Sequence, residues 1–248
     1  MTALLRSELL KVRTTRGWWA YLAVILLFSA IAVAGEIGSN PDFRSDLDFQ
    51  VGVVETATWI ARLIALVLGI TIVTTELRHG TITPTLLATP VRERVFAAKG
   101  IATGLLAVLF DVLSLAVIAA VGLTWLTLVD AEIHLGAELA ERAGQAVLAA
   151  VLWGLMGVAI GALVQSQVAA LVGTLIWIFL GETLLWGLFG WLDLDGAASY
   201  LPFQALDGAD GTRGDDMLAY APALVVSVAW IALIGAAGLW RLRRRDIT

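Results

Sequence analysis

Residues 53–75 read VVETATWIARLIALVLGITIVTT and are followed by residues 76–99, ELRHGTITPTLLATPVRERVFAAK. The first stretch is mostly apolar, and as a helix it is long enough to cross a hydrocarbon core about 30 Å thick. The second stretch is polar, with four basic residues and two Thr-Pro steps. The boundary between them therefore predicts a membrane-spanning helix that ends in a loop at one membrane face.

Similar apolar runs recur along the whole chain, which has 248 residues, 59% of them hydrophobic and only 15% charged. A soluble domain usually carries about 25% charged residues. The six runs long enough to span are residues 18–34, 53–75, 100–129, 143–164, 168–190 and 218–240. The third is longer than a bilayer requires, so we expect it to project from the membrane. The pattern predicts an all-α integral membrane protein with six transmembrane helices and a single domain over residues 1–248.

The fifth run contains Gly181, Gly187 and Gly190, which lower helix stability. We expect it to break into a spanning helix and a shorter piece, around residues 185–194, that dips back into the membrane. Residues 191–217 then form an extracellular loop.

Basic residues are distributed unevenly between the loops on the two sides of these spans. Twelve lysines and arginines fall in one set of loops and three in the other, while Arg62 lies inside a span. The loops that are poor in basic residues are rich in aspartate and glutamate. Because basic loops stay cytoplasmic, this distribution predicts that both termini and residues 76–99 are cytoplasmic.

The first 17 residues are predicted to form a helix that lies along the inner membrane surface. Leu5, Leu9 and Val12 recur at helical spacing, with Arg6 and Lys11 away from that stripe. A basic segment before an apolar run is also typical of a signal peptide. The run over residues 18–34 is at the long end for one, so we interpret it as an uncleaved first span.

The polar loop has the pattern of a short helix and a turn before a longer helix. Thr83-Pro84 suits a helix start, and Thr89-Pro90 repeats the signal. Leu86 and Leu87 lie between them, side by side in a cytoplasmic segment. The short helix either sinks back into the membrane interface or docks into a groove on a cytoplasmic partner.

These residues resemble the cytoplasmic loop of ABC-2-type transporter permeases. The resemblance rests on Glu76-x-x-x-Gly80-Thr81 and on the later positions Leu86, Leu87, Pro90, Arg92 and Lys99. It extends to Arg6-Ser-Glu-Leu-Leu-Lys11, as in actinobacterial members, and to Tyr200-Leu-Pro202 after the broken fifth span.

The resemblance implies the permease subunit of an ATP-driven exporter in a bacterial plasma membrane. Such a subunit pairs with a second permease, as a homodimer or heterodimer, and with two copies of a cytoplasmic ATPase. It implies that residues 81–89 form the coupling helix. The residues it assigns to coupling are Glu76, Gly80, Thr81, Pro84, Leu86, Leu87, Pro90 and Arg92.

Under this interpretation the chain is not an enzyme and binds no cofactor, metal or nucleic acid, while lipids surround it. The phosphate-binding pattern Gly-x-x-x-x-Gly-Lys-Ser/Thr is absent from the sequence, so ATP and magnesium would be held by the partner. A membrane-embedded transferase or protease, and an ATP-independent channel or anchor, are the alternatives. The absence of cysteine, and of histidine inside a span, argues against the enzyme.

Three charged residues lie deep inside predicted spans, Arg62, Asp111 and Glu182, while Glu55 lies at the outer headgroup level of its span. Each costs about 2.5–3.5 kcal/mol if unpaired at the helix centre. Arg62 and Asp111 have similar predicted depths, so one hypothesis is a buried ion pair that fixes helix register. The other is that Arg62 or Glu182 faces a substrate pathway, with Glu182 at an outer gate or hinge.

Overall fold

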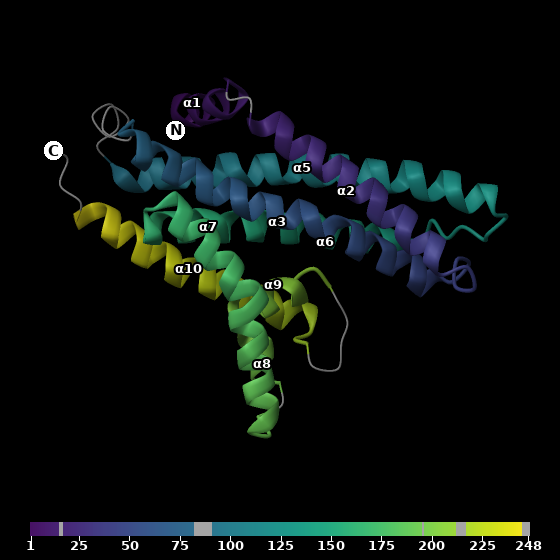
Figure 1. Ribbon diagram of the computed structural model, residues 1–248. Coiled ribbons are helices and arrows are strands. Elements are labelled where there is room, and N and C mark those ends of the chain that lie inside the picture. The colour runs from purple at the N-terminus through teal and green to yellow at the C-terminus, as the bar shows by residue number, and fades with distance from the viewer. Residues whose placement is uncertain (15–16, 82–90, 195, 212–216, 245–248) are drawn as a thin grey trace.

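The computed structural model describes residues 1–14, 17–81, 91–194, 196–211 and 217–244 (Figure 1). These residues form helices and their connections, and none of them is in a strand. The α-helices are α1 (Thr2–Thr14), α2 (Gly17–Ser39), α3 (Leu47–His79), α5 (Arg92–Leu128), α6 (Ala137–Val164), α7 (Gln167–Ile176), α8 (Glu182–Trp191), α9 (Pro202–Gly208) and α10 (Tyr220–Arg244). A π-helical turn, η1, covers Trp177–Gly181, and a 3-10 turn, η2, covers Ala198–Tyr200.

Six helical segments are long and apolar enough to span a membrane, and each overlaps one predicted span. The prediction of an all-α membrane protein with six transmembrane helices is confirmed. The third span, α5, has 37 residues and is longer than predicted because it begins at Arg92. Figure 1 shows α1 and the distal part of α10 at the same end of the bundle as the beginning of α5, which we call the terminal end.

Helices α3 and α6 form the centre of the bundle, and glycines allow the backbones of the two helices to approach closely. A methyl group on Gly157 would overlap the carbonyl oxygen of Leu66, and one on Gly69 would overlap the carbonyl oxygen of Gly154. Gly161 faces the backbone of Ile70 in the same way. Because water drives no burial between helices within a bilayer, this direct backbone contact is what lets dispersion forces hold the pair together.

The outer helices pack on this pair through small and polar side chains. On α2, the hydroxyl of Ser29 donates to the carbonyl oxygen of Ala57 at 3.1 Å and lies 2.7 Å from the hydroxyl of Ser114. One buried serine thereby joins α2 to both α3 and α5. Such hydrogen bonds are worth about 0.6 kcal/mol on average in a membrane protein, so they fix register more than they add stability.

The fifth span is broken where the glycine pattern predicted irregularity. The π-helical turn η1 separates α7 from α8, and Figure 1 shows α8 projecting away from the bundle. The return of residues 185–194 into the membrane stays a prediction; in the structure α8 continues as a helix to Trp191, which is 80% exposed. The segment that returns is α9: Phe203 and Leu206 are buried, and the Phe203 ring centre lies 5.3 Å from that of Trp153.

Candidate coupling site and buried charges

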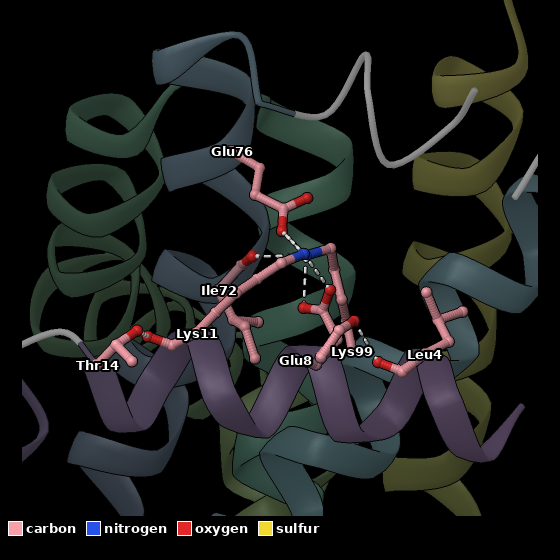
Figure 2. A network of polar contacts seen from close by, with 8 residues as sticks. Leu4, Glu8, Lys11, Thr14, Ile72, Glu76 and Lys99 are labelled. Atoms are coloured by element: carbon pink, nitrogen blue, oxygen red, sulfur yellow. Dashed lines mark hydrogen bonds and ion pairs between the residues drawn. The ribbon is translucent and has the colours of Figure 1, made fainter. Parts of the chain in front are cut away.

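Two lysines and two glutamates meet at the terminal end of the bundle, where α1 crosses the last turn of α3 and the first turns of α5. We call this group the four-residue ion cluster (Figure 2). Glu8 and Lys11 come from α1, Glu76 from the last turn of α3 and Lys99 from the second turn of α5. The spacing of Glu8 and Lys11 places both side chains on one face of α1. That face lies against the bundle.

Each lysine contacts both glutamates. The ammonium of Lys11 lies 2.6 Å from a carboxylate oxygen of Glu8 and 2.6 Å from one of Glu76. The ammonium of Lys99 lies 2.8 Å from Glu8 and 2.9 Å from Glu76, and it also donates to the carbonyl oxygen of Ile72 at 3.1 Å. The cluster is therefore balanced in charge.

The equal number of positive and negative charges matters because an unpaired charge is costly when it is buried. Glu8 is 0% exposed and Lys99 only 2%, while about two-fifths of the Lys11 side chain is exposed. Desolvation alone would lower the pKa of Lys11, but its hydrogen bonds to Glu76 and Glu8 outweigh that cost and raise the pKa above 10.5. Lys11 thus stays positively charged at neutral pH.

Both ends of the predicted coupling loop are attached to other parts of the protein. At its start, Glu76 in the last turn of α3 contacts Lys11 of α1 and Lys99 of α5. The helix then ends before Gly80, whose φ of 70° is a left-handed conformation that glycine adopts without strain. At its end, the guanidinium of Arg92 donates to the carbonyl oxygen of Leu242 on α10. The adjacent Glu93 pairs with Arg243, also on α10.

The predicted coupling residues divide into those the structure describes and those it does not. Glu76 lies in the ion cluster, Gly80 ends α3 and Thr81 follows it, and Arg92 begins α5. Pro84, Leu86, Leu87 and Pro90 lie outside the described residues, so their role in coupling stays a prediction. The burial of Glu76 favours an internal role for this side chain, linking the loop to α1.

Arg62 has a different partner from the one its depth suggested. Its guanidinium contacts the carboxylate of Asp210, just beyond α9, and its Nη2 donates to the carbonyl oxygen of Glu55 at 3.3 Å. Arg142 of α6 donates to the backbone carbonyl oxygen of Asp210 at 3.0 Å. The two arginines hold residue 210 against the middle of α3. Burial raises the pKa of Asp210, and the Arg62 charge opposes that rise.

Asp111 is fully buried on α5, and neither of its carboxylate oxygens has a hydrogen-bond partner among the described residues. The hypothesis of an Arg62–Asp111 ion pair is therefore wrong. The reason is that a segment far along the chain, after the fifth span, supplies the carboxylate that Arg62 contacts. The predicted depths of Arg62 and Asp111 in the membrane could not reveal that the Asp210 carboxylate would take the place of Asp111.

Glu182 joins the broken fifth span to α9. One carboxylate oxygen accepts from the indole nitrogen of Trp177 at 3.0 Å and from the backbone nitrogen of Phe203 at 2.9 Å. The other accepts from the backbone nitrogen of Gln204 at 3.0 Å. A carboxylate at these positions satisfies the free N–H groups that begin a helix. The arrangement fits a hinge position better than a residue exposed to a pathway, because Glu182 is only 1% exposed.

Glu182→Gln is expected to lower the melting temperature of the purified protein. A glutamine amide would place an N–H group against one backbone donor of α9, and an unsatisfied buried donor costs about 1–3 kcal/mol. Thermal unfolding in mild detergent measures the effect. Glu132→Gln, at an exposed position, is the matched control. Equal melting temperatures for the two variants would show that Glu182 does not hold α9.

Sequence patterns identified the charged residues inside spans but not their partners. Glu8 and Lys11 carried a local signal, since opposite charges three residues apart on one helix face suit an ion pair. The contact with Lys99 depends on how α1 crosses α5, which no local pattern encodes. Asp210 and Arg142 resembled ordinary charges in outer loops. Among the described residues, no group of three or more His, Asp or Glu side chains is placed to hold a metal ion.

Comparison with known proteins gives one family. The model of a family described as ABC-2 family transporter protein matches residues 4–181, well over half of the chain. The match begins in α1, includes all four members of the ion cluster and ends at the π-helical turn before Glu182. Comparison with curated proteins gives no match.

Proposed function

Because the chain belongs to the ABC-2 family of transporter proteins and is a multi-pass transmembrane permease, we propose that it is the permease subunit of an ATP-driven exporter. Residues 81–89 dock on a separate cytoplasmic ATPase, which binds ATP and magnesium. Two permease subunits enclose the pathway, and two ATPase subunits drive it. The subunit works in a bacterial plasma membrane with both termini in the cytoplasm.

The attachment of both loop ends is the observation that carries this proposal. A force on residues 81–89 would be transmitted to Glu76 at the start of the loop and to Arg92 at its end. From Glu76 it passes through Lys11 and Lys99 to α1 and α5. From Arg92 it passes to α10 through the carbonyl oxygen of Leu242. A loop that only connected two spans would not need such anchors at both ends.

The first experiment is to purify the tagged full-length chain from its own cells in mild detergent and assay the eluate for ATP hydrolysis. We expect an ATPase subunit in the complex, and the mass of the complex gives the number of each subunit. Deletion of residues 81–89 should release the ATPase while the permease remains in the membrane fraction. A complex that keeps its ATPase after this deletion would contradict the proposed docking site.

Leu87→Asp is expected to uncouple the two subunits, because a charge replaces an apolar side chain proposed to enter a groove on the ATPase. ATPase activity bound to the permease should fall close to the level of the deletion variant, with the amount of inserted permease unchanged. Leu128→Asp makes the same change at an exposed leucine at the opposite end of α5 and serves as control. Equal ATPase retention in the two variants would argue against docking through Leu87.

A further inference from the structure

A groove of about 270 Å³ lies between α5 and α6 at the end of the bundle away from the termini, and we call it the far-end groove. Its floor is α3, and the α5–α6 connection closes its top. The side chains that define it are Val53, Val54, Leu115, Leu123, Leu139 and Ala143. All of them are apolar, and the proposed function makes no use of them.

The contact between α5 and α6 changes from close packing near the terminal end to an open groove at the far end. Nearer the terminal end the two helices meet through small residues: a methyl group on Gly154 would lie 3.0 Å from Thr103 and 3.8 Å from Ala107. Farther along, α5 presents Leu115 and Leu123. Between and beside these leucines the lining residues Ala119 and Gly122 of α5 and Ala143 of α6 are small, and the space next to them is the groove.

Among the described residues that line the groove, the polar side chains are those of Gln50 and His134, and both have partners. Gln50 donates to the carbonyl oxygens of Arg44 and Glu132, at 2.8 and 2.7 Å, and accepts from the backbone nitrogen of His134 at 3.0 Å. The Nε2 atom of His134 lies 2.8 Å from the carbonyl oxygen of Ser45. These bonds hold the top of the groove closed and leave an apolar interior, which favours an apolar occupant.

Size and position narrow the choice of occupant. Apolar cavities of about 150 Å³ bind benzene, whereas pockets for drug-sized molecules begin near 300 Å³. The volume of the far-end groove lies between these two sizes, so its shape, and not its volume, favours an extended chain of methylene groups. Its α5 wall, residues 115–126, runs for about 17 Å, close to the depth of one leaflet.

From this geometry we propose that the far-end groove binds one acyl chain of a bilayer lipid, taken from the leaflet opposite the termini. The chain lies along α5 with its methylene groups against α3 and α6. This site is separate from the ion cluster and from α9, and it does not depend on an ATPase partner.

The test uses the full-length chain in nanodiscs of phosphatidylethanolamine and phosphatidylglycerol, with a small share of phosphatidylethanolamine that carries a diazirine in one acyl chain. After illumination, mass spectrometry locates the lipid adducts. We expect them to concentrate on residues 115–126 and 139–143. Adducts spread evenly over the outward faces of all spans would overturn the proposal, because they would show surrounding lipid only.

A filled variant and a matched control sharpen the result. Ala119→Leu combined with Ala143→Leu adds side chains at two positions that line the groove, and it should abolish the concentrated adducts. Ala120→Leu combined with Ala140→Leu adds the same atoms to exposed positions of the same helices and should leave them unchanged. Equal loss of adducts in the filled variant and the control would also overturn the proposal. So would labelling of the far-end groove by a free aromatic photoprobe without labelling by the lipid. If the filled variant does not fold, Ala119→Leu alone gives the same comparison.

Discussion

Gly157→Leu is expected to leave no folded protein in detergent extracts. Its side chain would have to occupy space held by the backbone of α3 at Leu66 and Ile70, and backbone atoms cannot move aside as a flexible side chain can. Overpacking a core costs about 1–3 kcal/mol when side chains can adjust. Here α3 and α6 must separate along the centre of the bundle, so we expect a larger cost. Size-exclusion chromatography of the solubilised protein measures the loss of the folded peak.

Gly144 provides the matched control on the same helix, since a methyl group built there meets nothing within 4 Å beyond its chain neighbours and the adjacent backbone of its own helix. Gly144→Leu should keep the folded peak. Gly144→Ala should raise stability by about 0.5–1 kcal/mol, because alanine is the better helix former. A folded Gly157→Leu protein that elutes and melts like Gly144→Leu would show that α3 and α6 are not in backbone contact.

Lys99→Met is expected to cost about 3–5 kcal/mol, the range for removing one partner from a buried ion pair. The change leaves Glu8 and Glu76 buried against Lys11 alone. The two carboxylates then repel each other, and the contact of α1 with the bundle weakens. We expect a lower melting temperature, together with faster hydrogen exchange in residues 2–14 than in the wild-type protein.

Two further variants separate this effect from a general loss of charge. Arg94→Met removes an exposed cation from the same helix and should change stability by less than about 0.5 kcal/mol. Glu8→Gln in the Lys99→Met background restores charge balance and should recover part of the loss, which a double-mutant cycle measures. Additive effects of Glu8→Gln and Lys99→Met would mean that the two side chains do not interact.

The sequence predicted the spanning helices well because the signals are local. Apolar length marks each span, and Gly181 lies at the end of the π-helical turn that breaks the fifth. Gly80 ends α3 by an equally local device, a left-handed backbone that glycine adopts without strain. Each of these features depends on residues within one or two helical turns.

The buried charges were predictable as residues but not as pairs. Arg62 and Asp210 are 148 positions apart, and their contact exists because α9 returns to the bundle. The exposed length of α8 and the buried position of α9 depend on how the break at η1 directs the chain. Similarly, Glu76 resembled a surface residue beside a loop, and only the crossing of α1 makes it a buried anion.

The glycine contact between α3 and α6 also has a mechanical consequence. Gly69 lies about 15 Å from the end of α3 at His79 and about 33 Å from the end at Leu47, at 1.5 Å per residue. If α3 tilts about this contact as a rigid rod, the Leu47 end moves about twice as far as the His79 end. The contact then acts as the fulcrum of an unequal lever, and a small displacement beside Glu76 arrives enlarged on the opposite side of the membrane.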